Sequence, residues 1–246
     1  TLTLTLTLTL TLTLTLTAGI VETQCAALAA RLEEIPPADR SRDDALALRI
    51  YAQYPNDVGI FCIYLLNYVV MQPGEALYLG ANEPHAYLSG ECAECMATSD
   101  NVVRAGCTPK FKDVDTLCSM LTYSDGSPHL VRPEPVGEGC HRYADFPAEE
   151  FMVDRVSLEQ GGAAVLPPMP GVSIIILCSG AVAIEERAEN HDTPGSDSHG
   201  DCAPWGVDSA AAHVAEKGAV FMVSPDTALR LEARGGAALG FRACAK

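Results

Sequence analysis

The sequence is poor in basic residues, and this shortage limits the partners that the chain can bind. It has 16 Lys and Arg residues against 32 Asp and Glu residues, which gives a formal net charge of −16 at pH 7. Nucleic acids and anionic membranes are bound through fields of Lys and Arg. We therefore expect neither partner, although one or two well-placed cations would suffice to hold a phosphorylated small molecule.

The sequence also lacks a long apolar run and a secretory signal. Residues 1–17 alternate Thr with Leu, so they are half polar, and they have no basic start and no usual cleavage site. The ten cysteines are scattered, and the zinc-knuckle spacing of Cys92 and Cys95 has no second pair to complete a site. Reduced thiols in the cytoplasm are the simplest interpretation.

The Thr-Leu repeat has a period of two, which predicts a β-strand. An exposed, uncharged strand of this kind is prone to associate through its edge. A translated DNA repeat and a misplaced gene start both explain the repeat more simply than a functional role does. The remaining chain, with 48% hydrophobic residues overall, is long enough to bury one or two ordinary cores.

Apolar spacing predicts helices first and strands later. Helical spacing is found over residues 19–34, 43–54 and 113–121, whereas the apolar run 58–70 is rich in β-branched and aromatic residues and predicts a buried strand. A second block of strands begins near residue 144 and is divided by Gly, Pro and Asp turns, as in a barrel or sandwich. Its expected strands cover residues 151–158, 172–178, 181–185, 219–223 and 228–231.

One imidazole follows a strand, a tight turn and a second strand. A strand over 76–79 is followed by a turn at 80–82, in which Asn82 can take the left-handed conformation, and His85 then points inward from the next strand. This spacing is that of the second motif of cupin barrels. The same count from Gly218 gives a turn at 224–226 and places Leu229 at the His position, so the second block is expected to keep the barrel without the metal.

Several longer runs carry a specific resemblance. They are Gln53-Tyr-Pro-Asn-Asp-Val-Gly59, Pro73-Gly-Glu-Ala76, Ala81-Asn-Glu-Pro-His-Ala-Tyr-Leu88, Glu94-Cys-Met-Ala97, Ser99-Asp-Asn-Val-Val-Arg-Ala-Gly106 and Thr108-Pro-Lys110. With these runs the chain resembles type I phosphomannose isomerase, a zinc enzyme that interconverts mannose 6-phosphate and fructose 6-phosphate. The resemblance implies that His85 is a zinc ligand and Arg104 the active-site arginine. It also implies that Tyr87 and Asp100 line the sugar site and that Lys110 contacts the phosphate.

The resemblance covers the C-terminal part of the family. It implies a mainly β fold with two cupin-like jelly-roll barrels and a small helical remnant near the amino end. The expected parts are the repeat 1–17, the helical remnant 18–54, a cupin-like domain 55–143 and a second cupin-like domain 144–246. The family's other zinc ligands lie in a Gln-x-His pair and an Asn-His-Lys-Pro-Glu run, and neither occurs here. One Zn²⁺ per complete site is therefore implied, held mostly by ligands that this sequence does not contain.

Two functions remain open at this point. The first is mannose-6-phosphate isomerase in GDP-mannose biosynthesis, working by zinc-assisted proton transfer through an enediolate, with this chain alone inactive or weakly active. The alternative is a non-catalytic cupin-like module that binds a sugar phosphate or another protein.

Two assignments within the site, and one outside it, also have alternatives. Arg104 could form a structural ion pair with Asp100, and Lys112 could contact the phosphate in place of Lys110, which is preferred by its motif position. The histidines and aspartates of residues 187–208 fit a surface loop better than a metal cluster.

Overall fold

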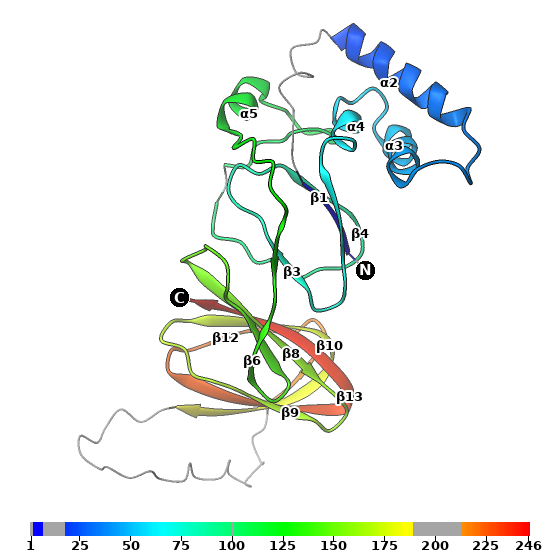
Figure 1. The fold of residues 1–246 in the computed structure, drawn as a ribbon. Helices are drawn as coiled ribbons and strands as arrows, with labels where there is room; N and C mark the ends of the chain where they lie inside the picture. The colour runs from blue at the N-terminus through cyan, green and yellow to red at the C-terminus, as the bar shows by residue number, and fades with distance from the viewer. Residues whose placement is uncertain (1, 7–17, 100, 189–212) are drawn as a thin grey trace. The chain divides into compact units, whose positions relative to one another are not determined.

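The computed structural model describes residues 2–6, 18–99, 101–188 and 213–246 (Figure 1). The chain divides into two compact units. Unit 1 consists of Thr1–Cys92 and Thr98–Leu130, and unit 2 of Ala93–Ala97 and Val131–Lys246. The four domain limits expected from the sequence stay predictions. No helix in the described ranges has the length and apolar character needed to cross a membrane.

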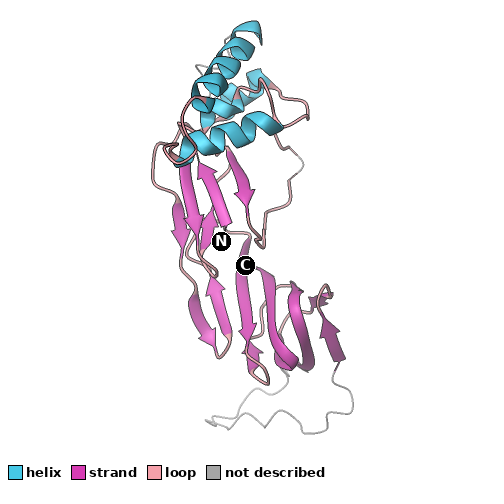
Figure 2. Cartoon of the chain, turned by 90° about the vertical axis from the view of Figure 1, so that its right-hand side faces the viewer, coloured by secondary structure: helices cyan, strands magenta, loops and turns pink. Residues whose placement is uncertain are grey.

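The first part of unit 1 is helical, and its helices form a hydrophobic core. The expected helices 19–34 and 43–54 are confirmed as α2 (Ala18–Glu33) and α3 (Arg42–Gln53), and Figure 2 shows the helices of this unit grouped together at one end of its strands. The hydroxyl of Ser41 caps α3 by accepting a hydrogen bond from the Asp44 backbone N–H at 3.1 Å. The buried side chains of this cluster are Val21, Cys25, Leu28, Leu32, Leu46, Ala47, Ile50, Ile60 and Ile63.

The strand predicted over residues 58–70 is wrong. The segment forms a short helix, α4 (Gly59–Cys62), then turns, and only its end belongs to a strand, β2 (Asn67–Met71). The Asp57 side chain accepts a hydrogen bond from the Gly59 N–H at 2.8 Å and so starts a helical turn. Ile60 and Ile63 are then buried three residues apart against the helices, and this packing overrides the strand propensity of the β-branched residues.

The strands of unit 1 form two small sheets. β1 (Leu2–Leu6) lies between β2 and β4 (His85–Ser89) in an antiparallel three-stranded sheet. β3 (Ala76–Tyr78) pairs with β5 (His129–Val131), and α5 (Val114–Met120) confirms the short helix expected near residue 113. The strand predicted from the Thr-Leu repeat is thus confirmed over its first described residues.

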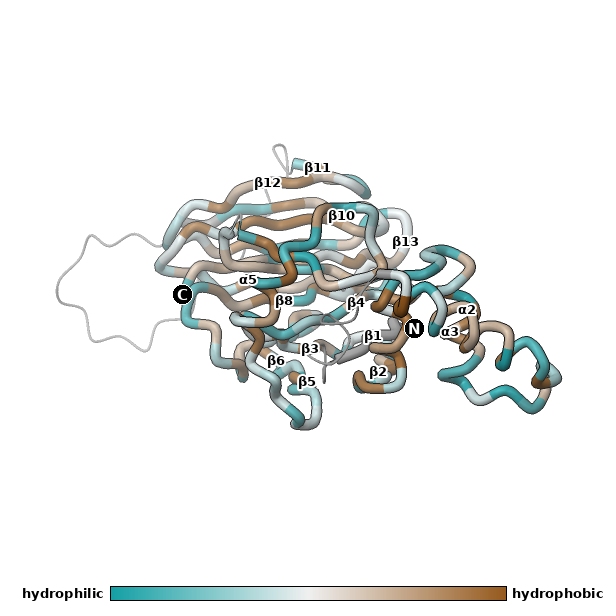
Figure 3. Tube along the Cα trace, turned by 90° about the horizontal axis from the view of Figure 1, so that it is seen from above, coloured by the Kyte–Doolittle hydropathy of each residue, from teal (hydrophilic) through white to brown (hydrophobic). Residues whose placement is uncertain are grey.

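Unit 2 is an antiparallel β structure built on two long strands. Its strands are β6 (Glu134–Gly137), β7 (Cys140–Tyr143), β8 (Phe151–Leu158), β9 (Ala163–Leu166), β10 (Ser173–Ala188), β11 (His213–Glu216), β12 (Val220–Val223) and β13 (Thr227–Ala245). The order is β11-β10-β13-β8-β7-β6, while β12 adds to β10 and β9 adds to β13. Figure 3 shows the apolar stretches of β10 in brown.

Two details of unit 2 differ from the expectation. The strands predicted at 172–178 and 181–185 are one strand, β10, whose pairing with β13 shifts register between Leu177 and Ala181. The block also begins earlier than residue 144, because β6 and β7 already belong to its sheet. The buried side chains between the strands include Val156, Leu166, Ile175, Leu177, Val182, Leu229 and Leu231.

A buried ion cluster fastens three strands of unit 2 to one another. The Asp154 carboxylate of β8 accepts hydrogen bonds from Arg242 Nη2 of β13 at 2.6 Å and from Arg142 Nε of β7 at 2.7 Å. Asp154 and Arg242 are fully buried. Because an unpaired charge inside a protein is costly, these three side chains fix the register of β7, β8 and β13.

Candidate active site

The turn before β4 has the geometry expected from its sequence. Asn82 has a φ of 62°, which confirms the left-handed conformation predicted for it. The Glu83 carboxylate accepts a hydrogen bond from the Gly80 N–H at 3.1 Å and closes the turn. The turn thus leads directly into His85, the first residue of β4.

The His85 ring is oriented by its own turn. Its Nδ1 lies 2.9 Å from the Glu83 carbonyl oxygen, and its ring meets that of Tyr87 edge to face at 5.7 Å between centroids. In the tautomer in which Nδ1 donates to this carbonyl, Nε2 carries the lone pair that a metal ion needs. His85 is exposed, as are most residues of β4 on both faces of the strand, so the inward direction predicted for it stays a prediction.

The described residues do not make a complete zinc site. Within the described ranges, no group of three or more His, Cys, Asp and Glu side chains lies close enough to hold a metal ion. A catalytic zinc needs three protein ligands and an open position, so His85 fits as one ligand and no more. Asp100 and the histidines of the loop 189–212 lie outside the described residues.

Two half-buried thiols near the helices do not supply the missing ligands. Burial, together with the nearby charge of Asp57, raises the pKa of Cys62 to about 11 and the pKa of Cys107 to about 12. Metal ions bind the thiolate, and these two groups stay protonated at neutral pH. They act as small apolar side chains.

Arg104 presents an exposed cation on the segment after β4. The residue is exposed, and it forms no hydrogen bond or ion pair with another residue of the described ranges. Since Asp100 is not among those residues, the ion pair considered for Arg104 stays untested. The guanidinium is always charged and presents five donors in a plane, which suits it to an oxyanion.

The two lysines of the same segment have different surroundings. Lys112 Nζ lies 2.7 Å from the Asp57 carboxylate, and both side chains are largely shielded from solvent. Lys110 is exposed, and its ammonium forms no ion pair within the described part of the chain. The sequence left the phosphate contact open between the two, and the structure commits Lys112 to Asp57.

Asp57 holds this segment against the start of α4. Burial raises the pKa of Asp57, but the hydrogen bonds from Lys112, Cys107 and Gly59 together lower it by more than burial raises it. The pKa of Asp57 therefore lies below its ordinary value. A Cβ on Gly106 would lie 2.8 Å from the Gly59 Cα, so the two loops touch through glycines. We did not anticipate this support from the sequence, although an Asp two residues before a Gly is a usual signal of such a turn.

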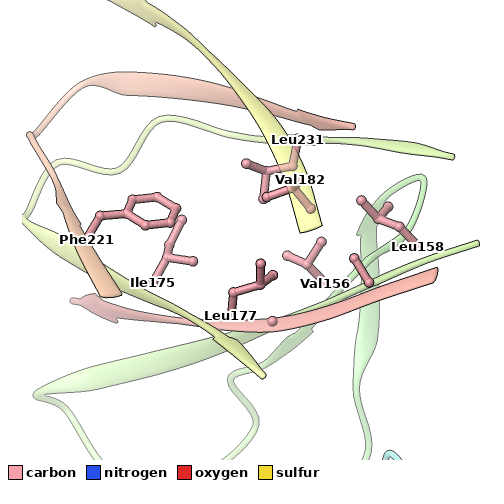
Figure 4. Close-up of a pocket in the computed structure, with 9 residues that line it drawn as sticks. Val156, Leu158, Ile175, Leu177, Val182, Phe221 and Leu231 are labelled. Carbon is pink, nitrogen blue, oxygen red and sulfur yellow. The ribbon is translucent and has the colours of Figure 1, made fainter. Parts of the chain in front are cut away.

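Unit 2 offers no comparable site in its described residues. A narrow hollow among its strands is lined by apolar side chains such as Ile175, Leu177 and Phe221 and by Gly240 (Figure 4). Leu229, at the position equivalent to His85, is 1% exposed and belongs to the core. A hollow without a polar or titratable group has nothing with which to orient a sugar phosphate.

Comparisons with known proteins show which proteins this chain is similar to. A model of the phosphomannose isomerase type I helical insertion domain matches residues 14–66. The probable mannose-6-phosphate isomerase of Dictyostelium discoideum is 46% identical over 173 residues, which are 69% of this chain and 38% of that protein. Mannose-6-phosphate isomerase 1 of Arabidopsis thaliana is 51% identical over 137 residues, 56% of this chain and 32% of that protein.

Solved structures agree on the fold. A phosphomannose isomerase of Salmonella typhimurium, solved with substrate and zinc, superposes with a TM-score of 0.63 at 24% identity and covers 95% of this chain and 52% of its own. A mutant of the same enzyme reaches a TM-score of 0.69 at 20% identity over 100% of this chain and 64% of its own. At this identity the likeness shows the fold alone, and it confirms the mainly β, cupin-like class.

The chain therefore has a mainly β, cupin-like fold. Over the residues that these comparisons match, it is a relative of the type I phosphomannose isomerases, as its motifs predicted. It spans between 32% and 40% of the length of the curated relatives that it matches.

Proposed function

We propose that this chain is part of a mannose-6-phosphate isomerase and interconverts mannose 6-phosphate and fructose 6-phosphate once the rest of the family's length accompanies it. The observation that carries this proposal is the 46% identity over 173 residues to the Dictyostelium discoideum isomerase. We further propose that it works in the cytoplasm, in GDP-mannose biosynthesis.

The proposed site is assembled along β4 and the segment after it. His85 is proposed as one metal ligand, and the other ligands must come from outside the described residues. Tyr87, beside the His85 ring, and Asp100 are proposed to line the sugar. The exposed ammonium of Lys110 is proposed to hold the phosphate as a point charge, which is supported by the ion pair of Lys112 with Asp57.

Arg104 is proposed to act on the reaction itself. Aldose-ketose isomerisation moves a proton between neighbouring carbons, and a negatively charged enediolate forms on the way. A guanidinium that is not neutralised by a described neighbour can stabilise that charge as it develops. The exposed position of Arg104 leaves its donors available for this task.

A fusion protein tests the proposal directly. The amino-terminal part of the Dictyostelium discoideum relative, up to its helical insertion domain, is joined to residue 18 of this chain and loaded with zinc. We expect conversion of mannose 6-phosphate in an assay coupled to fructose 6-phosphate. The His85→Gln fusion should lose both zinc and turnover, whereas Lys112→Met should keep its activity at a temperature where it is folded.

The same fusion decides between the two candidate functions. A folded, zinc-loaded fusion that binds mannose 6-phosphate in calorimetry without converting it would support the non-catalytic module, and the isomerase proposal would fall. The exposure of His85 and the lack of a metal cluster in the described residues are the observations that keep this alternative in view.

A further inference from the structure

Asp57 joins two segments of unit 1 that lie far apart in the sequence. Its carboxylate accepts hydrogen bonds from the backbone N–H groups of Gly59 and Cys107, and its side chain is only 10% exposed. Lys112 Nζ lies 2.7 Å from the same carboxylate. A carboxylate shielded from water holds its donors strongly, because water does not compete for its oxygens. Asp57 therefore anchors the segment 104–112 at a point within it, residue 107.

Close packing also fixes the backbone at this anchor. Cys107 has a φ of 53°, a left-handed conformation that a residue other than Gly adopts only where its surroundings impose it. A Cβ on Gly59 would lie 2.7 Å from Cys107 Sγ, and a Cβ on Gly106 would lie 2.8 Å from the Gly59 Cα. The two segments thus fit together with no room for a further carbon atom, and the N–H bond to Asp57 holds the strained residue in place.

Arg104 lies three residues before the anchor, and its direction follows from its neighbours. Val103 and Ala105 are partly buried against the small apolar cluster at α5, whereas Arg104 between them is exposed. Since the side chains before and after it pack inward, Arg104 points outward. Asp57 then sets the position of the backbone from which the guanidinium extends.

We propose that Asp57 is a positioning residue for the isomerisation: by holding the Gly59 and Cys107 N–H groups, it places Arg104 where negative charge develops on the enediolate. The inference rests on the proposed function, because it assigns a task to a residue that supports that site. Lys112 reaches the carboxylate through a long flexible side chain, so it balances the charge without fixing the backbone. A displacement of about 1 Å in such a group can lower turnover by roughly a hundredfold.

A matched pair of double variants of the fusion enzyme described above tests this role. Asp57→Asn/Lys112→Met removes both charges and keeps a side-chain oxygen that can accept the two backbone hydrogen bonds. Asp57→Ala/Lys112→Met removes both charges and that oxygen as well. Lys112→Met alone is the common reference. Hydrogen exchange of the Gly59 and Cys107 amides is followed in the chain of 246 residues carrying the same substitutions.

We expect the alanine double variant to have a kcat about tenfold or more below that of the asparagine double variant, with a smaller change in KM, because Arg104 is displaced. The asparagine double variant should turn over nearly as fast as the reference. The Cys107 amide should lose its protection from exchange with alanine and keep it with asparagine. Kinetics are measured at a temperature where urea unfolding shows all three proteins to be folded.

A third substitution separates positioning from a general loss of structure. If Asp57 acts through Arg104, an enzyme without the guanidinium has nothing for the anchor to place. The two double variants should therefore have equal kcat once each also carries Arg104→Ala. A difference that persists without Arg104 would overturn the proposal, and so would equal kcat in the two double variants while Arg104 is present.

Gly106→Ala serves as a second variant should the alanine double variant fail to fold. It inserts a Cβ 3.0 Å from Asp57 Oδ1 and pushes the segment off its anchor while Asp57 itself stays intact, so a normal kcat would contradict the proposal.

Failure of the proposed function gives a different result. A zinc-loaded fusion without any turnover refutes the isomerase activity, whereas the exchange measurement still decides whether Asp57 anchors the segment. A Cys107 amide that is equally protected in both double variants would then refute the anchor.

Discussion

At the scale of single residues, Arg104 and Lys110 are the two exposed cations on the segment that follows β4. In the fusion enzyme described above, we expect Arg104→Ala to lower kcat by about a hundredfold or more, because a donor aimed at developing charge acts mainly in the transition state. Lys110→Ala should act mainly on KM, since a phosphate is held about equally in the ground and transition states. Steady-state kinetics of the two variants separate these effects.

The conservative variant Arg104→Lys serves as the control for this prediction. It keeps the charge and loses the planar set of donors, so it should recover only part of the turnover. An Arg104→Ala enzyme with normal kcat and a lower melting temperature would instead assign Arg104 to a structural ion pair with Asp100.

Asp57 gives a prediction about acid stability. Its pKa is lowered in the folded chain, so its ionised form contributes stability that is complete above the ordinary value of 3.8 and is lost as the pH falls through the folded pKa. Urea unfolding of the wild type should therefore weaken below that value, and Asp57→Asn should show a flatter pH profile. Asp43→Asn is the matched control, because the Asp43 pair with Arg42 is exposed and should contribute little.

Single residues were predicted from sequence where the signal is local. The left-handed Asn82 follows from a turn within five residues, and the sequence was sufficient for it. The sequence was not sufficient to choose between Lys110 and Lys112, because this choice depends on Asp57, which is 55 residues away from Lys112 along the chain. The exposure of His85 depends on which strands surround β4, and no local pattern contains that information.

At the scale of elements, helices with clear periodicity were predicted well and mixed apolar segments were not. α2, α3 and α5 agree with the expected ranges within a residue or two. The segment 58–70 failed because its hydrogen-bonded turn at Asp57 and its packing against α3 are tertiary features. The long strand β10 was divided in two because Gly180 looked like a turn, whereas it forms a bulge.

That bulge makes Gly180 a sensitive position. Gly180 has a φ of 74°, and a Cβ there would overlap the Ala237 carbonyl on the paired strand β13. Gly235 has nearly the same φ, 73°, but a Cβ there would meet open space. We expect Gly235→Ala to lower the free energy of unfolding by about 1 kcal/mol, from backbone strain alone. Gly180→Ala should lower it by roughly 3 kcal/mol or more, because overlap with the neighbouring strand is added to the strain.

Urea unfolding of the two alanine variants measures this difference. Because the φ angles match, the excess in Gly180→Ala isolates the close approach of β13. Equal losses of unfolding free energy in the two variants would mean that β10 and β13 move apart at the bulge without an energetic cost.

At the scale of the whole molecule, the cupin-like class could be predicted from the sequence because its turns and strand spacings repeat. The second block shows this directly: the turn at residues 224–226 was expected from the count that gave His85, and Leu229, which that count placed at the His position, is buried in the core. The position of the Thr-Leu repeat as a middle strand could not be predicted from the sequence, because strand order depends on contacts between distant parts of the chain.

The final prediction concerns the metal content of the chain as it stands. One imidazole with an available Nε2 binds zinc far more weakly than three converging ligands do, and the described residues bring no three ligands together. The purified chain of 246 residues should therefore contain much less than one zinc per molecule by elemental analysis, and it should convert little or no mannose 6-phosphate.

His85→Gln should reduce even this weak binding, and Cys92→Ser should not, because Cys92 has no second pair of ligands. Tight one-to-one zinc in the unmodified chain would contradict the prediction and would point to replacement ligands. Glu91 and Glu94, which follow β4, would be the first to change to Gln in that case, since carboxylates near His85 in sequence are the most accessible additional oxygen ligands.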